Sequence, residues 1–189
     1  RIRLEGHSTD STKLLFDLGG NGDCISARGT QARFEILPAA DGVQGSRKIT
    51  VPDAHAVFSQ GSIWYLHEQD DSLITSAWAL GSTGQLIQTD TALHDTLKLK
   101  YALRRDFRLS RNMRLQMAMP VKHVSLYNFS IERLDSTASQ TANIDFTRVN
   151  QSLIRCVKST KCNFSHVSLS YCSEIEVSGC HFADAFSFG

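Results

Sequence analysis

Two carboxylates at the end of an apolar stretch are candidates for acid–base chemistry. Glu132 and Asp135 come where the apolar pattern ending at Ile131 gives way to a polar segment. Paired carboxylates can hydrolyse a glycosidic bond when they lie about 5–10 Å apart across a sugar. Neighbouring residues of a strand point to opposite faces, so Glu132 and Arg133 are expected on opposite faces. An outward Arg133 is a candidate for substrate binding, and the alternative is an ion pair with Asp135 that fixes the loop.

A histidine and an aspartate near the C-terminal end form a second candidate catalytic pair. His181 and Asp184 are three residues apart, a spacing that could give a base and a carboxylate to orient it. The step from His166 to His181 does not match the repeat described below, so the two histidines need not be neighbours. The alternative places His181 and Asp184 at turn or surface positions.

Candidate substrate-binding residues lie in the middle of the chain. Arg104 and Arg105 open the densest basic stretch, residues 104–114. Arginine forks bind carboxylates, and a neutralised uronate carboxylate helps a base to remove the neighbouring proton. Trp64 and Trp78 could hold sugar rings on their faces. The alternatives are a solvated strand for the arginines and a small β core for the tryptophans.

The elements that must position these residues follow a 23-residue repeat. The apolar pattern of residues 144–166 returns in residues 167–189, with no identical residue at the matched apolar positions. The matched positions are Ile144 and Val167, Phe146 and Leu169, Val149 and Cys172, Ile154 and Val177, and Val157 and Cys180. Repeats of this length built from strands indicate a solenoid. Cys172 and Cys180 are therefore expected as small buried hydrophobes, with a disulfide between neighbouring coils as the alternative.

Three zones are expected along the chain. Residues 1–40 and 121–189 show short strands and turns of coils, and the second zone is expected to continue beyond the chain end. Residues 41–120 show alternating patterns that indicate half-buried antiparallel strands. The interval from Leu126 to Ile154 is longer than the repeat, and the extra length fits a protruding loop at residues 135–141.

Composition and simple motifs exclude several classes of protein. The net charge of +1 and the absence of a basic stripe argue against binding of nucleic acid. A transmembrane helix needs an apolar run of about 18 residues or more, and none is present in the sequence. The chain starts with Arg1, as expected of a processed or excised piece. Residues 19–23 match neither a phosphate loop nor a calcium repeat. No cofactor is evident, and calcium stays open without a motif to support it.

Three stretches resemble the rungs of right-handed parallel β-helix proteins of the pectate-lyase-like superfamily. They are residues 2–16, residues 121–131 and residues 175–189. The resemblance implies an all-β fold, a right-handed parallel β-helix (solenoid) with a β-rich insertion at residues 41–120. The superfamily includes polysaccharide lyases, glycoside hydrolases, phage tailspikes and non-catalytic surface proteins, so the fold does not choose an activity.

Two functions stay open at this point. The first is a secreted or cell-surface protein that acts on a polysaccharide or surface glycan, as a lyase or a hydrolase. The second is a non-catalytic surface or adhesion module that binds glycans or proteins. The oligomeric state is open. Asn128, Asn150 and Asn163 fit the glycosylation pattern, but asparagines at coil corners are expected instead to bond the backbone.

Overall fold

The computed structural model describes residues 1–69, 72 and 74–186, without the side chain of Trp78. The chain divides into two compact units. The coil unit contains Arg1–Gly29 and Pro120–Gly189, and the insertion unit contains Thr30–Met119. Among the described residues no helix is long and apolar enough to cross a membrane.

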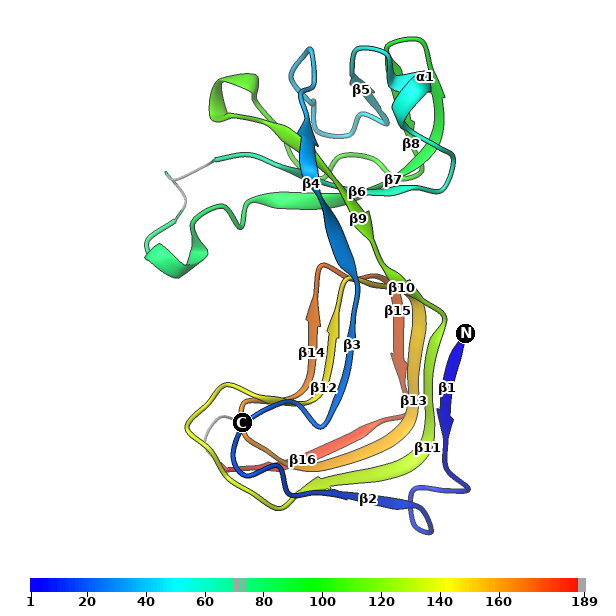
Figure 1. Cartoon of the computed structure of the whole chain (residues 1–189), viewed down its shortest axis with the longest axis vertical. Coiled ribbons are helices and arrows are strands. Elements are labelled where there is room, and N and C mark those ends of the chain that lie inside the picture. Colours follow the sequence, from blue (N-terminus) through cyan, green and yellow to red (C-terminus); the bar gives the residue numbers. More distant parts are fainter. Residues whose placement is uncertain (70–71, 73, 187–189) are drawn as a thin grey trace. The chain divides into compact units, whose positions relative to one another are not determined.

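The coil unit is a right-handed parallel β-helix of four coils, as predicted (Figure 1). Its described strands all pair in parallel. The first coil contains β1 (Ile2–Glu5), β2 (Lys13–Phe16) and β3 (Ile25–Arg28). The second contains β10 (Val121–Lys122), β11 (Val124–Arg133) and β12 (Ala142–Thr147). The third contains β13 (Val149–Cys162) and β14 (Ser165–Ser170), and the fourth contains β15 (Ser173–Ser178) and β16 (His181–Ala185).

The register of these strands confirms the predicted repeat. Ile144 pairs with Val167, and Ile154 pairs with Val177, so the third and fourth coils follow one another at the predicted repeat. Leu126 pairs with Ile154, which confirms the longer interval predicted for the second coil. Residues at equivalent positions therefore stack directly over one another from coil to coil.

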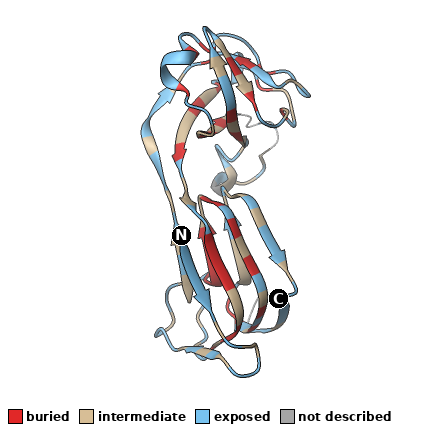
Figure 2. Ribbon diagram, turned by 90° about the vertical axis from the view of Figure 1, so that its right-hand side faces the viewer, coloured by how far each residue is buried: buried red, intermediate tan, exposed pale blue. Residues whose placement is uncertain are grey.

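Stacking of apolar side chains forms the core of the coil unit. Figure 2 shows buried residues concentrated in the middle strands. The fully or nearly buried members are Val124, Leu126, Phe129, Ile131, Ile144, Phe146, Val149, Ile154 and Val157. Burial depends on having a coil on both sides, because Ile154 is 0% exposed while its partner Val177 is 41% exposed. Cys172 and Cys180 pack against this core and are free thiols, like the other three cysteines.

The coil corners repeat a left-handed backbone conformation at the same register. Asn128, Cys156 and Gly179 have φ values of 55°, 51° and 61°. A side chain in this conformation costs roughly 1–2 kcal/mol, which only glycine avoids. In the first coil, Gly6 lies so close to the second coil that a Cβ on it would clash with the carbonyl oxygen of Asn128. The corners are therefore set by the coil register and tolerate residues other than glycine.

Asparagines stabilise the backbone, as predicted, at two of the three sites. The buried Asn150 amide donates to the carbonyl and Oγ of Ser173, at 3.2 and 2.7 Å. The buried Asn163 accepts from the Thr137 backbone N–H at 3.1 Å and donates to Thr141 Oγ1 at 3.2 Å. Their amides are thus used inside the coil unit.

The insertion unit is an antiparallel sheet with short helices. Its elements are β4 (Thr30–Ile36), β5 (Lys48–Thr50), α1 (Ala54–Val57), β6 (Ile63–His67), η2 (Ala77–Ala79), β7 (Gly84–Leu93), β8 (Thr96–Leu99), η3 (Leu109–Arg111) and β9 (Arg114–Met119). The strand order is β4-β9-β6-β7-β8-β5. The unit begins at Thr30 and not near residue 41, because β4 pairs antiparallel with β9. The strand pattern of residues 32–36 thus belongs to this sheet.

Truncating a stacked core side chain should destabilise the coil unit selectively. We expect Ile154→Ala to cost about 2–5 kcal/mol, because the cavity lies between two neighbouring coils. Hydrogen exchange should show faster opening of β11 and β13 and unchanged exchange of β6. The exposed control Arg155→Ala should have a much smaller effect. Equal effects of the two substitutions would contradict the stacking account.

Candidate functional site

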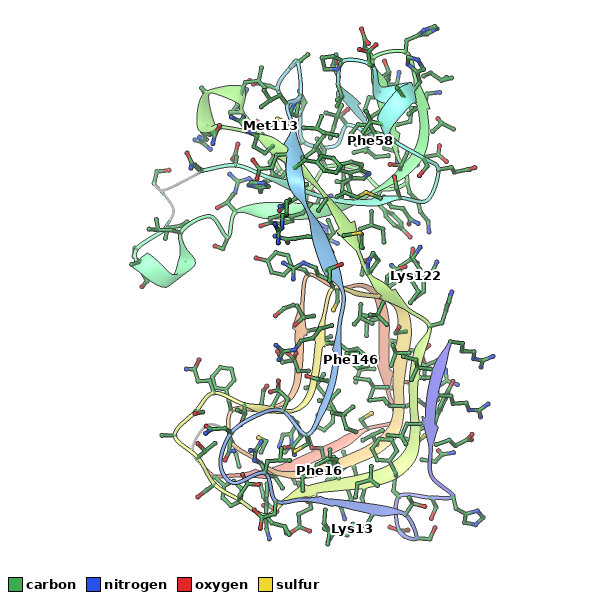
Figure 3. The ribbon with its side chains drawn as sticks, in the orientation of Figure 1. Lys13, Phe16, Phe58, Met113, Lys122 and Phe146 are labelled. Carbon is green, nitrogen blue, oxygen red and sulfur yellow. The ribbon has the colours of Figure 1, made fainter. Side chains whose placement is uncertain are left out.

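The outer face of the sheet formed by β2, β11, β13 and β16 carries polar ladders. Lys13 pairs with Ser130, Ser130 with Lys158, and Lys158 with His181. Because inward and outward residues alternate along a strand, the buried Ile131 and Ser159 place these neighbours on the outside. Figure 3 labels Lys13 on the outer side of β2. One outward position therefore carries a basic residue in three of the four coils.

A second outward ladder lies beside the first. Glu132 pairs with Leu15 in the first coil and with Thr160 in the third. Lys161 and Asp184 follow at the next corner, where both have left-handed backbone (φ 56° and 62°). They occupy equivalent positions of the repeat, so the corner carries a cation in one coil and an anion in the next.

These ladders line an open groove with a volume of about 370 Å³, which we call the outer groove. Its lining residues come from all four coils, and all of them are polar. They are Thr9, Asp10, Lys13, Ser130, Glu132, Lys158, Thr160, Lys161 and Asp184. The groove thus offers ammonium groups, carboxylates and hydroxyls, which are the partners of a polar ligand.

Glu132 is held as a carboxylate by two lysines from neighbouring coils. Lys13 forms an ion pair with it, and Lys161 Nζ lies 2.6 Å from Glu132 Oε1. Hydrogen bonds from Lys13 and Lys161 lower the pKa of Glu132 to about 2. A group that is ionised at neutral pH cannot act as a general acid there. In this arrangement Glu132 joins three coils and orients the two ammonium groups.

Arg133 and Asp135 form an internal clamp. Arg133 is 0% exposed, and its guanidinium donates to Asp135 Oδ2 at 3.0 Å and to the Gly22 carbonyl at 2.8 Å. Asp135 accepts from the backbone N–H groups of Leu18 and Gly20, at 3.0 and 2.8 Å. Burial opposes the charge on Asp135, but these bonds and Arg133 lower its pKa overall.

The clamp corrects one expectation and confirms another. Arg133 was expected to face outward, and it faces the interior because Glu132 occupies the outward position. The two side chains do point to opposite faces, as predicted. The polar groups of Arg133 and Asp135 bond each other and residues 18–22. Their role is therefore structural, because these bonds hold residues 18–22 against the 135–141 loop.

The predicted His181–Asp184 pair is not formed. In the described part of the chain no hydrogen bond joins the two side chains. His181 pairs with Lys158 in the first outward ladder, and Asp184 lines the outer groove. His166 is separate: its Nδ1 lies 2.9 Å from Ser159 Oγ, and its ring stacks on Phe182 at 5.5 Å. Burial lowers the pKa of His166, and the fully buried Ser159 is not accessible to a substrate.

The arginine candidates lie in the insertion unit and bind a carboxylate of the protein itself. Arg105 Nη2 donates to the fully buried Glu68 at 3.0 Å, and Arg111 does so at 3.4 Å. The backbone N–H of Arg108 donates to the same carboxylate at 2.7 Å. Arg104 is exposed, and its backbone N–H bonds Gln85. The stretch is therefore anchored by bonds within the protein, although Arg104, Arg108 and Arg111 are exposed.

Of the two tryptophan candidates, Trp64 is buried as a core residue and does not support sugar stacking. Trp64 is 1% exposed, so its face cannot meet a ligand. It packs against Phe58 at 4.4 Å between ring centroids and donates from Nε1 to Ser62 Oγ at 2.9 Å. Trp64 is a core residue of the insertion unit because β6 lies in the middle of its sheet. The side chain of Trp78 lies outside the described part of the structure.

The sequence candidates missed the lysines and hydroxyls of the outer groove. Lys158 and His181 are one repeat apart, as are Lys161 and Asp184, so polar positions carry the same repeat signal as the core. Extending the repeat from apolar to outward positions could have found them. Among the described residues, no group of three or more His, Cys, Asp or Glu side chains is placed to hold a metal ion.

Comparison with known proteins shows the fold and no family. No protein-family model and no curated protein matches the sequence. The structure is similar to the tailspike protein gp49 from Pseudomonas phage LKA1, with a TM-score of 0.68 and 14% identity, covering 97% of this chain and 33% of that one. It is also similar to the tailspike gp61 of Pseudomonas phage phi297, with a TM-score of 0.64 and 13% identity, covering 98% and 36%. The chain spans about a third of the length of these tailspikes.

A third similarity is too low to support an argument. The gp54 tailspike of Acinetobacter baumannii bacteriophage AP22, in complex with capsular saccharide, aligns at a TM-score of 0.49 and 14% identity, covering 95% of this chain and 39% of that one. At these identities the two stronger similarities show the right-handed parallel β-helix fold alone.

Neutralising Glu132 should change how stability depends on pH. Its folded-state pKa of about 2 lies below the ordinary value of 4.5. The ion pairs therefore contribute stability fully above pH 4.5, and the contribution is lost as the pH falls toward 2. We expect the Tm of Glu132→Gln to be lower than that of wild type at pH 7 and to fall less between pH 5 and pH 2.5. An exposed control, Asp10→Asn, should keep the wild-type profile, and parallel profiles for all three proteins would contradict the assignment.

Removing the acid of the clamp should be costly. Asp135→Ala leaves the buried Arg133 charge and two backbone N–H groups without their acceptor, so we expect a loss of about 3 kcal/mol or more in the free energy of unfolding. The exposed Asp17→Ala, from the same region of the chain, should change it by less than about 0.5 kcal/mol. Urea unfolding followed by circular dichroism measures both, and a neutral Asp135→Ala would rule out the clamp.

Proposed function

We propose that this chain binds a polysaccharide or surface glycan in the outer groove, as part of a secreted or cell-surface β-helix protein. The observation that carries the proposal is the groove itself. Its cavity of about 370 Å³ crosses all four coils and is lined only by polar side chains. A saccharide presents hydroxyl groups along its whole length, and carboxylates, ammonium groups and hydroxyls are their natural hydrogen-bond partners.

The dimensions support an extended ligand. Adjacent coils lie about 4.8 Å apart, so residues of the first and fourth coils are separated by about 14 Å. A ligand that touches Lys13 and Asp184 must therefore be longer than one sugar ring. Because outward positions recur in each coil, the groove presents side chains at regular intervals along its length, which suits a polymer that spans several coils.

The similarity of fold is compatible with this function. Two of the structures that resemble the chain are phage tailspikes. The fold supports many functions, so the proposal depends on the groove and not on the similarity.

Cleavage of the glycan is a second candidate function, favoured by carboxylates in the same groove. Glu132 and Asp184 both line it, on the second and fourth coils. Glu132 is fixed as an anion by its lysines, so it is not the general acid of such a reaction. New reducing ends without absorbance of an unsaturated product would indicate a hydrolase. Reducing ends together with that absorbance would indicate a lyase, because elimination also releases a reducing end. Binding without either signal would favour the non-catalytic module.

Filling the groove should weaken binding. Thr160 lines the groove from β13, and we expect Thr160→Tyr to lower glycan affinity by about tenfold or more through steric exclusion. The control is Thr50→Tyr on the edge strand β5, an exposed threonine in the insertion unit. Biolayer interferometry against a panel of acidic and neutral polysaccharides measures both. The proposal fails if no polymer binds, or if Thr160→Tyr binds as wild type does.

A further inference from the structure

Among the three lysines of the outer groove, Lys158 is the one that makes no ion pair with another described residue. Lys13 and Lys161 are both paired with Glu132. Lys158 is exposed, lines the groove and has no ion-pair partner among the described residues. The register places it between Ser130 of the second coil and His181 of the fourth.

The other charged side chains of the groove are two lysines and three carboxylates. Glu132 is paired with Lys13 and Lys161 and makes no ion pair with Lys158. Asp184 lies in β16. The pKa of Lys161 is raised mainly by Glu132 and, to a smaller extent, by the charge of Asp184. Asp10 lies in the segment before β2. Beside Lys158 the register places Ser130, whose hydroxyl donates to the Thr12 carbonyl at 3.3 Å and can still accept a hydrogen bond. On the other side it places the exposed imidazole of His181, which can also bond a sugar hydroxyl.

We propose that Lys158, flanked by Ser130 and His181, forms a subsite for a carboxylate substituent of the bound saccharide. This inference rests on the proposed function and names its substrate class: an acidic polysaccharide with a uronate-type carboxyl group. An ammonium bound to a carboxylate makes a charge-assisted hydrogen bond, which is stronger than a bond to a neutral hydroxyl. The paired lysines then bind the flanking hydroxyls, and Lys158 distinguishes acidic from neutral chains.

The test compares each polymer with its own neutral form. Polygalacturonate, alginate and hyaluronan are used before and after reduction of their carboxyl groups to primary alcohols, with dextran as a neutral polymer. Biolayer interferometry measures binding of wild type, Lys158→Met and the control Lys122→Met. Methionine keeps an unbranched, largely aliphatic side chain and removes the charge, and Lys122 is an exposed lysine on β10 that does not line the groove. Thermal unfolding checks that the variants fold.

We expect wild type to bind at least one native acidic polymer about tenfold more tightly than its reduced form. Lys158→Met should lower binding of the native polymer to the level of the reduced one, leave the reduced one unchanged, and differ from Lys122→Met in this respect. Equal binding of native and reduced polymers by wild type overturns the carboxylate subsite and leaves the proposed function intact. So does an equal loss of both forms in Lys158→Met. No binding to any polymer contradicts the subsite and the proposed function together.

Discussion

In-register stacking of successive coils is the constraint on which the rest of the coil unit depends. Parallel backbone ladders place each residue directly over its equivalent one repeat away. Inside, this produces the stack of Leu126, Ile154 and Val177, in which the middle side chain is fully buried. Outside, the same geometry produces the ladder that contains Lys158 and His181. One register therefore produces both features: the core on the inner face of these strands and the groove on their outer face.

The register also has to accommodate the extra length of the second coil. The buried clamp between Arg133 and Asp135 does this, because it holds the start of the 135–141 loop against residues 18–22. Further buried polar groups at this corner are satisfied as well: Asn143 bonds Ser159, and Asn163 bonds Thr141. A buried polar network of this kind is stable only when its members are paired. The corner thus joins the first coil to the second, although the insertion separates these coils in the sequence.

The sequence predicted the coils far better than the groove. Apolar spacing located the repeat and the insertion, since burial restricts residue type at inward positions. Outward positions carry no such restriction, and Lys13 and Ser130 pair although the whole insertion separates them in the chain, so no local pattern relates them. Trp64 is a core residue, as the β-core alternative predicted, because residue type alone does not distinguish a core aromatic from one that stacks on a sugar. Arg133 was predicted to face outward because a buried arginine needs bonding partners, and the sequence does not show that Asp135 and the Gly22 carbonyl supply them.

The central claim is that a glycan occupies the outer groove of the coil unit, and lysine footprinting tests it most directly. Lysines are acetylated with and without a bound acidic polysaccharide, and the extent of labelling at each is measured by mass spectrometry. The account predicts strong protection of Lys158, partial protection of Lys13 and Lys161, and unchanged labelling of Lys98 in the insertion unit and of Lys122. Protection confined to Lys98, or equal protection of all these lysines, would contradict it.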